Sequence, residues 1–173
     1  MSHTALQPSE YHAFYLPYIQ KVNENASVIQ GLKDSHNAFL EIISPLSDDA
    51  LNVSYAPGKW TIKEIIGHLC DSERIFANRV LRFARHDKTD LPGFDETLFA
   101  VNSNAASRTK DSLLAELSTV RGGSILLFQS LEESWYTNTG TIGGKNMSVR
   151  ALGYIMSGHQ LHHLEVIKSK YLK

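Results

Sequence analysis

The chain has 173 residues, of which 42% are hydrophobic, and 17 Lys and Arg residues nearly balance 18 Asp and Glu residues, for a formal net charge of −1. This length suits one domain with one core, so we predict that residues 1–173 form a single domain. Without an excess of positive charge there is no general field to hold a phosphate backbone, and we therefore expect no nucleic-acid partner.

Cysteine usage and hydropathy bound the environment of the protein. The single cysteine, Cys70, excludes an intramolecular disulfide framework and suits a reducing compartment. No apolar run approaches the ~18 residues of a membrane span, and no signal pattern opens the chain. We therefore expect a soluble, cytoplasmic protein without a membrane partner. Eight histidines are more than a chain of this length usually has, which directs attention to metals.

The first third of the chain has a helical pattern. Apolar residues recur at helical spacing from Pro8 to Leu46. The polar residues Asn23 to Asn25 interrupt this pattern, and Pro45 ends it. We predict a short helix followed by a longer one.

The next helix has the clearest start signal. It follows a turn at Pro57-Gly58, and Thr61 and Glu64 have the spacing of a capping box, a structural role that we prefer for Glu64 over a catalytic one. An apolar stripe extends this helix to about Arg85 or His86. The stripe consists of Ile62, Ile65, Leu69, Phe76, Val80 and Phe83.

The remaining chain alternates irregular segments and helices. Residues 87–107 are rich in turn formers, which predicts a long connection with one helical turn. A helix is predicted from Thr109 to Glu133, although Gly122-Gly123 weakens it. Residues 135–147 favour a short hairpin. Ser148 then caps a last helix that extends to about Leu172.

These four principal helices predict an all-α, four-helix bundle. A helix of about 24 residues is about 36 Å long, and the 87–107 connection is long enough to run back along it. Helices two and three can therefore be parallel. We predict an up-down-down-up bundle with a long crossover between its second and third helices.

Three histidines lie on the last helix, in the stretch GHQLHH. Each helical residue advances by ~100°, so His159 and His163 are only ~40° apart on consecutive turns, and the apolar residues Leu152 and Val166 flank His159 on the same face. This pair is predicted to face the core. His162 lies at the edge of the stripe, as a partly exposed side chain, a support for the ligands, or an alternative ligand.

Two inward imidazoles are costly to bury unless their nitrogens are bound, and one metal ion satisfies both. His68, near the apolar stripe of the second helix, is the best third ligand. Three neutral imidazoles leave a coordination position open, as in catalytic zinc sites. Zinc is the default metal, while nickel, iron and copper also accept imidazole. Simple hydrogen bonding of buried or surface histidines remains the alternative.

Other metal motifs fit the sequence poorly. Gln160 stands where the general-base glutamate of HExxH would be needed. A di-iron bundle requires ExxH on two helices, but the corresponding positions are Ile65 and Met156. We therefore predict a mononuclear centre.

Few other polar residues suggest a catalytic role. Asp71 and Glu73 are predicted to be solvated or paired with Arg74 or Arg79. Ser72, one turn after His68, is close enough along the helix to touch a ligand. No GxSxG elbow indicates a serine nucleophile, so the catalytic residues stay unassigned. Tyrosines and tryptophans are explained as core packing.

The chain resembles the DinB/YfiT-like superfamily of metal-dependent hydrolases over nearly its whole length. The resemblance lies in YAPGKWTIKEIIGHLCDSER (55–74), RFAR (82–85), LPGFDE (91–96) and GHQLHHLEVIKSKYL (158–172). It implies an up-down-down-up four-helix bundle. It also implies a metal triad of one histidine from the second helix and an HxxxH pair from the last, which correspond to His68, His159 and His163.

Family members include bacillithiol-dependent S-transferases and a mycothiol-dependent isomerase. The resemblance therefore implies a small-molecule substrate, with a low-molecular-weight thiol as a candidate. We expect a zinc or nickel ion to activate a bound thiol or water, in a hydrolase or a thiol S-transferase. A non-catalytic, metal-binding stress-response module and a metal-free bundle are the alternatives. A homodimer is expected, because bundles often pair through an apolar face.

Overall fold

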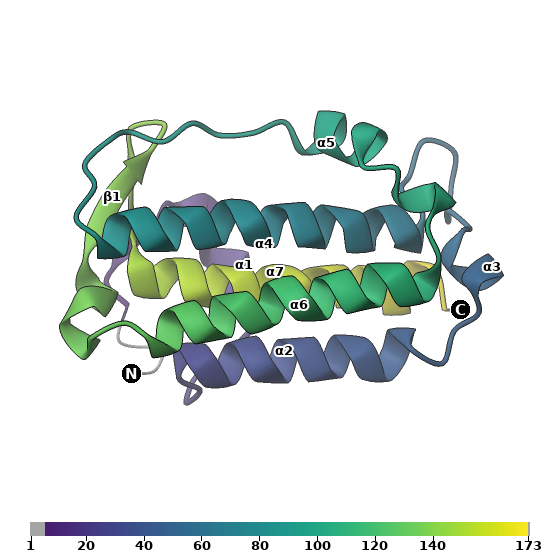
Figure 1. Ribbon diagram of the computed structural model, residues 1–173, viewed down its shortest axis with the longest axis horizontal. Coiled ribbons are helices and arrows are strands. Elements are labelled where there is room, and N and C mark those ends of the chain that lie inside the picture. Colours follow the sequence, from purple (N-terminus) through teal and green to yellow (C-terminus); the bar gives the residue numbers. More distant parts are fainter. Residues whose placement is uncertain (1–5, 173) are drawn as a thin grey trace.

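The computed structural model describes residues 6–172. Four long helices lie side by side along the long axis of the molecule (Figure 1): α2 (Val28–Ile43), α4 (Ile62–Ala84), α6 (Lys110–Gln129) and α7 (Val149–Lys170). Helix α2 packs against α6 and α7, and α4 packs against the same two helices. The prediction of a mainly helical bundle is confirmed. No helix within residues 6–172 combines the length and apolar character needed to cross a membrane.

Short elements connect the long helices. These are α1 (Leu16–Ile19), α3 (Asp48–Leu51), α5 (Glu96–Asn102), and 3-10 turns at Pro8–Glu10, Ala13–Tyr15, Ala105–Ser107 and Glu133–Thr137. The predicted hairpin consists of β1 (Thr139–Ile142) and β2 (Lys145–Ser148), paired antiparallel. Gly143 and Gly144 form its turn with positive φ angles, which glycine adopts at little cost.

The ends of the long helices follow local chemistry. Glu64 N donates to Thr61 Oγ1 at 3.2 Å, and Thr61 N donates to Glu64 Oε2 at 2.7 Å, so the predicted capping box starts α4. Helix α6 ends at Gln129, four residues before the predicted end. The hydroxyl of Tyr136 donates to the carbonyl of Phe128 at 2.8 Å and satisfies a group at the helix end that a longer helix would use.

The connection from α4 to α6 runs back along the bundle (Figure 1). Asp48 Oδ1 accepts from Lys63 Nζ at 2.8 Å and from Lys110 N at 3.0 Å, so the beginnings of α4 and α6 lie at the same end. The connection contains more helix than the single turn predicted, because α5 spans seven residues. Asp95 caps it by accepting a hydrogen bond from Leu98 N at 2.9 Å.

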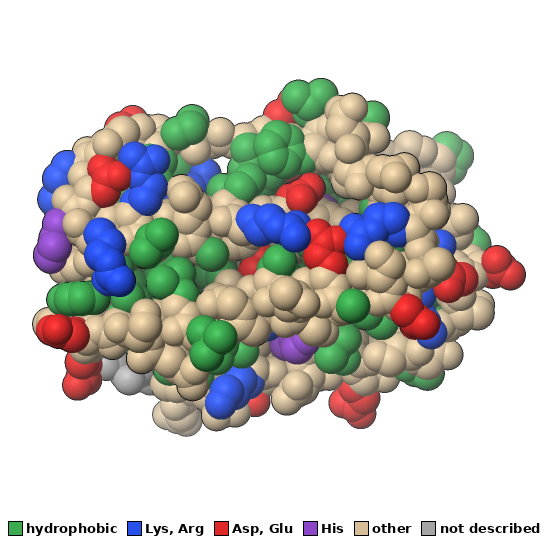
Figure 2. Space-filling view, viewed as in Figure 1, with side chains coloured by type: hydrophobic (Ala, Val, Ile, Leu, Met, Phe, Trp, Pro, Cys, Tyr) green, Lys and Arg blue, Asp and Glu red, His purple; other side chains and the backbone are tan. Residues whose placement is uncertain are grey.

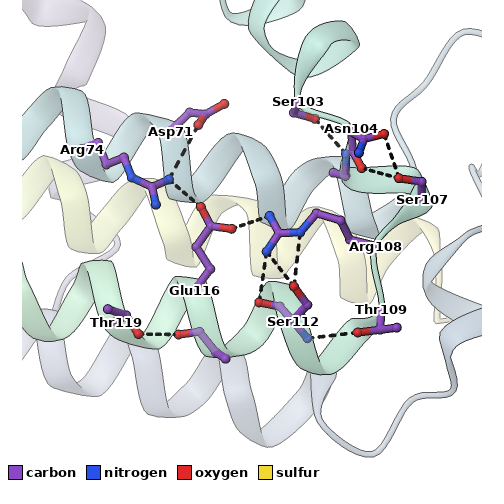
Figure 3. A network of polar contacts seen from close by, with 12 residues as sticks. Asp71, Arg74, Ser103, Asn104, Ser107, Arg108, Thr109, Ser112, Glu116 and Thr119 are labelled. Atoms are coloured by element: carbon purple, nitrogen blue, oxygen red, sulfur yellow. Dashed lines mark hydrogen bonds and ion pairs between the residues drawn. The ribbon is translucent and has the colours of Figure 1, made fainter.

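An ion-pair network fastens the end of this connection to the bundle (Figure 3). Glu116 on α6 accepts from Arg74 Nη1 of α4 at 2.6 Å and also pairs with Arg108. Arg108 in turn donates to Ser112 Oγ at 2.9 Å. Figure 2 shows basic and acidic side chains alternating across the middle of this face, over α4 and α6. The network lies near the surface, with Arg74 exposed and Glu116 half-buried, so it contributes little to stability, but it fixes where the connection meets α6.

The bundle core consists of two apolar clusters, one toward each end. One cluster includes Leu32, Phe83, Phe128 and Leu152. The other includes Phe39, Ile66, Leu113 and Leu164. Along α2, α4, α6 and α7, buried polar side chains occupy the positions between these clusters: Ser35, Ser72, Glu73, Arg121, Ser157 and Gln160. The metal-ligand candidates lie beside this polar layer.

A buried ion pair forms the centre of the polar layer. Arg121 Nε lies 2.9 Å from Glu73 Oε1, and Arg121 Nη2 donates to Glu73 Oε2 at 3.0 Å. Arg121 Nη1 also donates to Ser35 Oγ at 3.0 Å. The expectation that Glu73 is solvated or paired on its own helix is wrong, because this carboxylate points inward to α6. Asp71 does pair with Arg74, at 3.9 Å.

Candidate metal centre

Helices α4 and α7 bring the three predicted ligands together. His68 Nε2 and His163 Nε2 each lie 3.1 Å from His159 Nε2. One nitrogen from each ring lies within 4.8 Å of the other two. The i, i+4 spacing on α7 places His159 and His163 on consecutive turns, as predicted, and His68 faces them from α4. Metal ligation by these residues stays a prediction.

The spacing of the nitrogens suits a shared metal ion. Two imidazoles that bind one zinc ion at about 2.0–2.1 Å have nitrogens about 2.8–3.4 Å apart, for bond angles between 90° and the tetrahedral value. Hydrogen bonding explains the cluster less well. A neutral ring nitrogen either donates one N–H or accepts through one lone pair, so His159 Nε2 cannot satisfy both neighbours. A cation would satisfy all three lone pairs.

Burial keeps these rings neutral. It lowers the pKa of His68 to about 4. Burial, with smaller effects of His68 and His162, lowers the pKa of His163 to about 3. The pKa of His159 lies well below its ordinary value, first through burial and then through the neighbouring histidines. All three are therefore unprotonated at neutral pH, the state in which imidazole binds a metal.

Aromatic rings enclose the cluster. The ring of Trp60 lies 4.9 Å from that of His68 and is stacked 6.5 Å from that of His163. Tyr18 of α1 meets His159 edge-on at 5.5 Å and His162 at 5.3 Å. The explanation of Trp60 and Tyr18 as ordinary core packing therefore missed their place beside the site. No local pattern marks them, because the contacts join segments distant in the sequence.

The other predicted site residues, His162 and Ser72, lie outside the three-histidine cluster. His162 is half-buried against Tyr18 and lies outside the three-histidine cluster. Ser72 is buried one turn after His68, and neither Ser72 Oγ nor His68 Nδ1 has a hydrogen-bond partner among the described residues. Gln160 is fully buried in the polar layer. The roles predicted for His162 and Ser72 stay predictions.

Two cavities reach the cluster from different sides. One, with a volume of about 380 Å³, is lined by Trp60, His162, His163 and Tyr171 among others. The other, of about 120 Å³, is lined by Tyr18, Phe76 and His159 among others. Among the described residues no carboxylate or thiol joins the three histidines. The arrangement therefore combines three candidate nitrogen ligands with access for a small molecule.

A family model describes most of the chain. The model of the DinB superfamily matches residues 32–167, a range that contains all three histidines. The chain belongs to the DinB superfamily. This confirms the resemblance found in the sequence.

Named members of the superfamily are similar to this chain. A "Putative metal-dependent hydrolase" of Oceanobacillus iheyensis is 26% identical over 136 residues, which are 76% of each chain. The "Putative metal-dependent hydrolase YfiT" of Bacillus subtilis is 29% identical over 107 residues, which are 62% of this chain and 54% of YfiT. Both relatives are thus named for metal-dependent hydrolysis.

Two solved structures share the fold of this chain. The structure of YfiT from Bacillus subtilis, with an unusual four-helix bundle topology, matches with a TM-score of 0.71 at 18% identity and covers 82% of each chain. A mycothiol-dependent maleylpyruvate isomerase matches with a TM-score of 0.66 at 11% identity, over 79% of this chain and 57% of its own. At these identities the likeness establishes the fold.

The contact between α1 and α7 gives a first prediction for this DinB protein. A methyl group on Gly158 would lie 1.8 Å from the carbonyl oxygen of Tyr18, so Gly158→Ala is expected to push α1 away from the three-histidine cluster. Overpacking of this kind costs about 1–3 kcal/mol or more. The matched control is Gly123→Ala in α6, where no atom lies within 4 Å. It should stabilise by about 0.4–1 kcal/mol. Equal urea midpoints for both variants would contradict the close contact.

The low histidine pKa values give a second prediction, for metal-free protein. Unfolding restores the pKa of His68 from about 4 to about 6.5, so below pH 6.5 the unfolded chain binds a proton that the folded chain does not. Stability therefore falls as the pH drops from about 6.5 toward 4, by up to about 1.4 kcal/mol per pH unit for this residue. Urea unfolding at pH 7, 6 and 5 measures it. In His68→Leu, stability should fall less steeply with decreasing pH. An unchanged slope in that variant would oppose this explanation.

Proposed function

We propose that this protein is a metal-dependent enzyme with one metal ion held by His68, His159 and His163. The observation that carries the proposal is the convergence of their Nε2 atoms, two pairs of which are 3.1 Å apart. The depressed pKa values of His68 and His163 leave nitrogen lone pairs available at neutral pH. Zinc or nickel is the metal we propose, since both accept imidazole.

The chemistry follows from an open coordination position. A divalent metal at this centre lowers the pKa of a water or thiol bound beside the histidines. Residues of the chain hold and shield the site. Trp60 and Tyr18 pack against the histidine rings and limit their rotation, which keeps the Nε2 atoms directed to one point. The cavities beside His163 and His159 admit a small-molecule substrate.

The reaction we propose is either hydrolysis or transfer of a low-molecular-weight thiol to an electrophile. The names of the relatives from Oceanobacillus iheyensis and Bacillus subtilis support hydrolysis. The name of the mycothiol-dependent isomerase supports a thiol cosubstrate. In both reactions the nucleophile is generated at the same centre, so one set of ligands serves either.

Activity assays on metal-loaded protein test this proposal. The protein is loaded with zinc or nickel and given bacillithiol or glutathione with monochlorobimane, and separately a panel of esters and amides. We expect turnover in at least one assay, and loss of that turnover after chelation and in His163→Ala. Stoichiometric metal without turnover in any assay would instead support the non-catalytic, metal-binding module.

Three further properties belong to the same proposal. We propose the up-down-down-up order for α2, α4, α6 and α7, which the shared end of α4 and α6 beside Asp48 supports. We propose a homodimer, since α5 exposes apolar side chains (Figure 2), among them Leu98 and Val101. A cytoplasmic location is supported by the single cysteine, whose pKa burial raises to about 12.

A further inference from the structure

Arg79 of α4 is a buried cation without a buried anion. Its residue exposure is 4%, its Nη2 donates to the carbonyl of Pro92 at 2.9 Å, and its guanidinium carbon lies 5.6 Å from the Phe76 ring centroid. Among the described residues no carboxylate lies within ion-pair distance of it. The positive charge of Arg79 therefore has no ion-pair partner among the described residues.

The other deeply buried arginines differ from Arg79 in this respect. Arg121 pairs with Glu73, and Arg150 pairs with Glu10. A buried charge is normally paired, because removal from water is costly and an opposite charge offsets that cost. The structure thus follows the rule at Arg121 and Arg150 and departs from it at Arg79, which lines a cavity without an ion-pair partner among the described residues.

Arg79 lines the cavity that also contains His159. The Phe76 ring links the two residues. It lies 6.1 Å from the His159 ring and also contacts the Arg79 guanidinium. Tyr15, Tyr18 and Phe94 also line this cavity. The wall therefore offers one cation, several aromatic faces and one edge of the proposed metal centre.

We propose that this cavity binds a small monocarboxylate with an apolar body, whose carboxylate pairs with Arg79. The aromatic side chains contact the apolar body, and the remaining end faces His159. A single negative charge is favoured over a phosphate dianion, because Glu96 lines the same cavity and would repel a dianion more strongly than a monoanion. The orientation toward His159 rests on the proposed function, whereas binding of the carboxylate by Arg79 needs no metal.

The test measures binding to metal-free protein, so that a carboxylate cannot bind through a metal ion. Benzoate, phenylacetate and 3-phenylpropanoate are titrated beside their primary amides. NMR chemical shifts of the protein's backbone N–H groups give the dissociation constants. We expect at least one acid to bind about 10- to 100-fold more tightly than its amide, the range for a hydrogen bond to a charged group. Arg79→Gln should remove this preference.

Arg85→Gln is the matched control, because it removes one positive charge from the exposed end of the same helix, where Arg85 lies over Trp135. It should keep the preference for acids. Equal binding of every acid and its amide by the natural protein would overturn the proposal, as would an unchanged preference in Arg79→Gln. If that variant does not fold, the acid-to-amide comparison on the natural protein still decides. Metal content, measured separately, tests the proposed function independently.

Discussion

Replacing His163 by alanine is expected to lower zinc affinity by at least about 100-fold, and His68→Ala should do the same. Loss of a residue that merely supports a metal ligand typically costs 10- to 100-fold, so loss of a ligand should cost more. Each of these histidines places its Nε2 atom 3.1 Å from that of His159 and supplies one of three candidate ligands. Competition with a chromogenic chelator gives the affinity, and elemental analysis gives the stoichiometry.

His162→Ala is the matched control for both variants. His162 lies on the same helix, next to His163, and contacts Tyr18, but it lies outside the three-histidine cluster. The His162→Ala variant should still bind one equivalent of zinc and should lose less affinity than His163→Ala. If His162→Ala lost zinc as strongly as His163→Ala, or if His68→Ala kept full affinity, the assignment of ligands would be wrong.

Glu73→Gln is expected to destabilise the protein by about 3–5 kcal/mol, because it leaves Arg121 buried without an opposite charge. Arg121 is 2% exposed, and both of its carboxylate contacts go to Glu73. Glu116→Gln is the matched control nearer the surface, since it weakens the more exposed ion pairs with Arg74 and Arg108. It should cost less than about 1 kcal/mol. Urea unfolding of the metal-free proteins measures both.

The double replacement Glu73→Leu with Arg121→Met separates the charge from the packing. Apolar residues of similar volume often replace a buried ion pair without loss. The double variant should therefore be more stable than Glu73→Gln alone. Equal losses of stability in Glu73→Gln and Glu116→Gln would contradict the expected cost of leaving Arg121 buried without an opposite charge.

Features written in local sequence were predictable. The helical pattern and the Thr61–Glu64 spacing located α4 closely, and Ser148 marked the start of α7. The length of α5 was not predicted, because turn-forming residues around it hide the cap at Asp95. The end of α6 was misplaced by four residues, and one hydrogen bond at that end comes from Tyr136, a residue outside the helix that no local pattern marks.

The candidate site was predictable where helical periodicity decides it. The ~100° step placed His159 and His163 on one face, the apolar stripe of the second helix singled out His68, and the resemblance implied the same three residues. Long-range partners were not predictable. Glu73 faces α6 rather than its own helix, and the position of Arg79 beside His159 depends on the packing of the 87–107 connection and the N-terminal segment against α4. Contacts of this kind arise from tertiary packing and leave no periodic pattern.

X-ray absorption at the zinc edge of the zinc-loaded protein tests the central claim most directly. The structure predicts three imidazole nitrogens at about 2.0–2.1 Å with the multiple-scattering pattern of histidine, plus one light-atom ligand from solvent. In His163→Ala the imidazole contribution should fall. A sulfur ligand, or fewer than three imidazoles in the natural protein, would contradict a mononuclear centre formed by His68, His159 and His163.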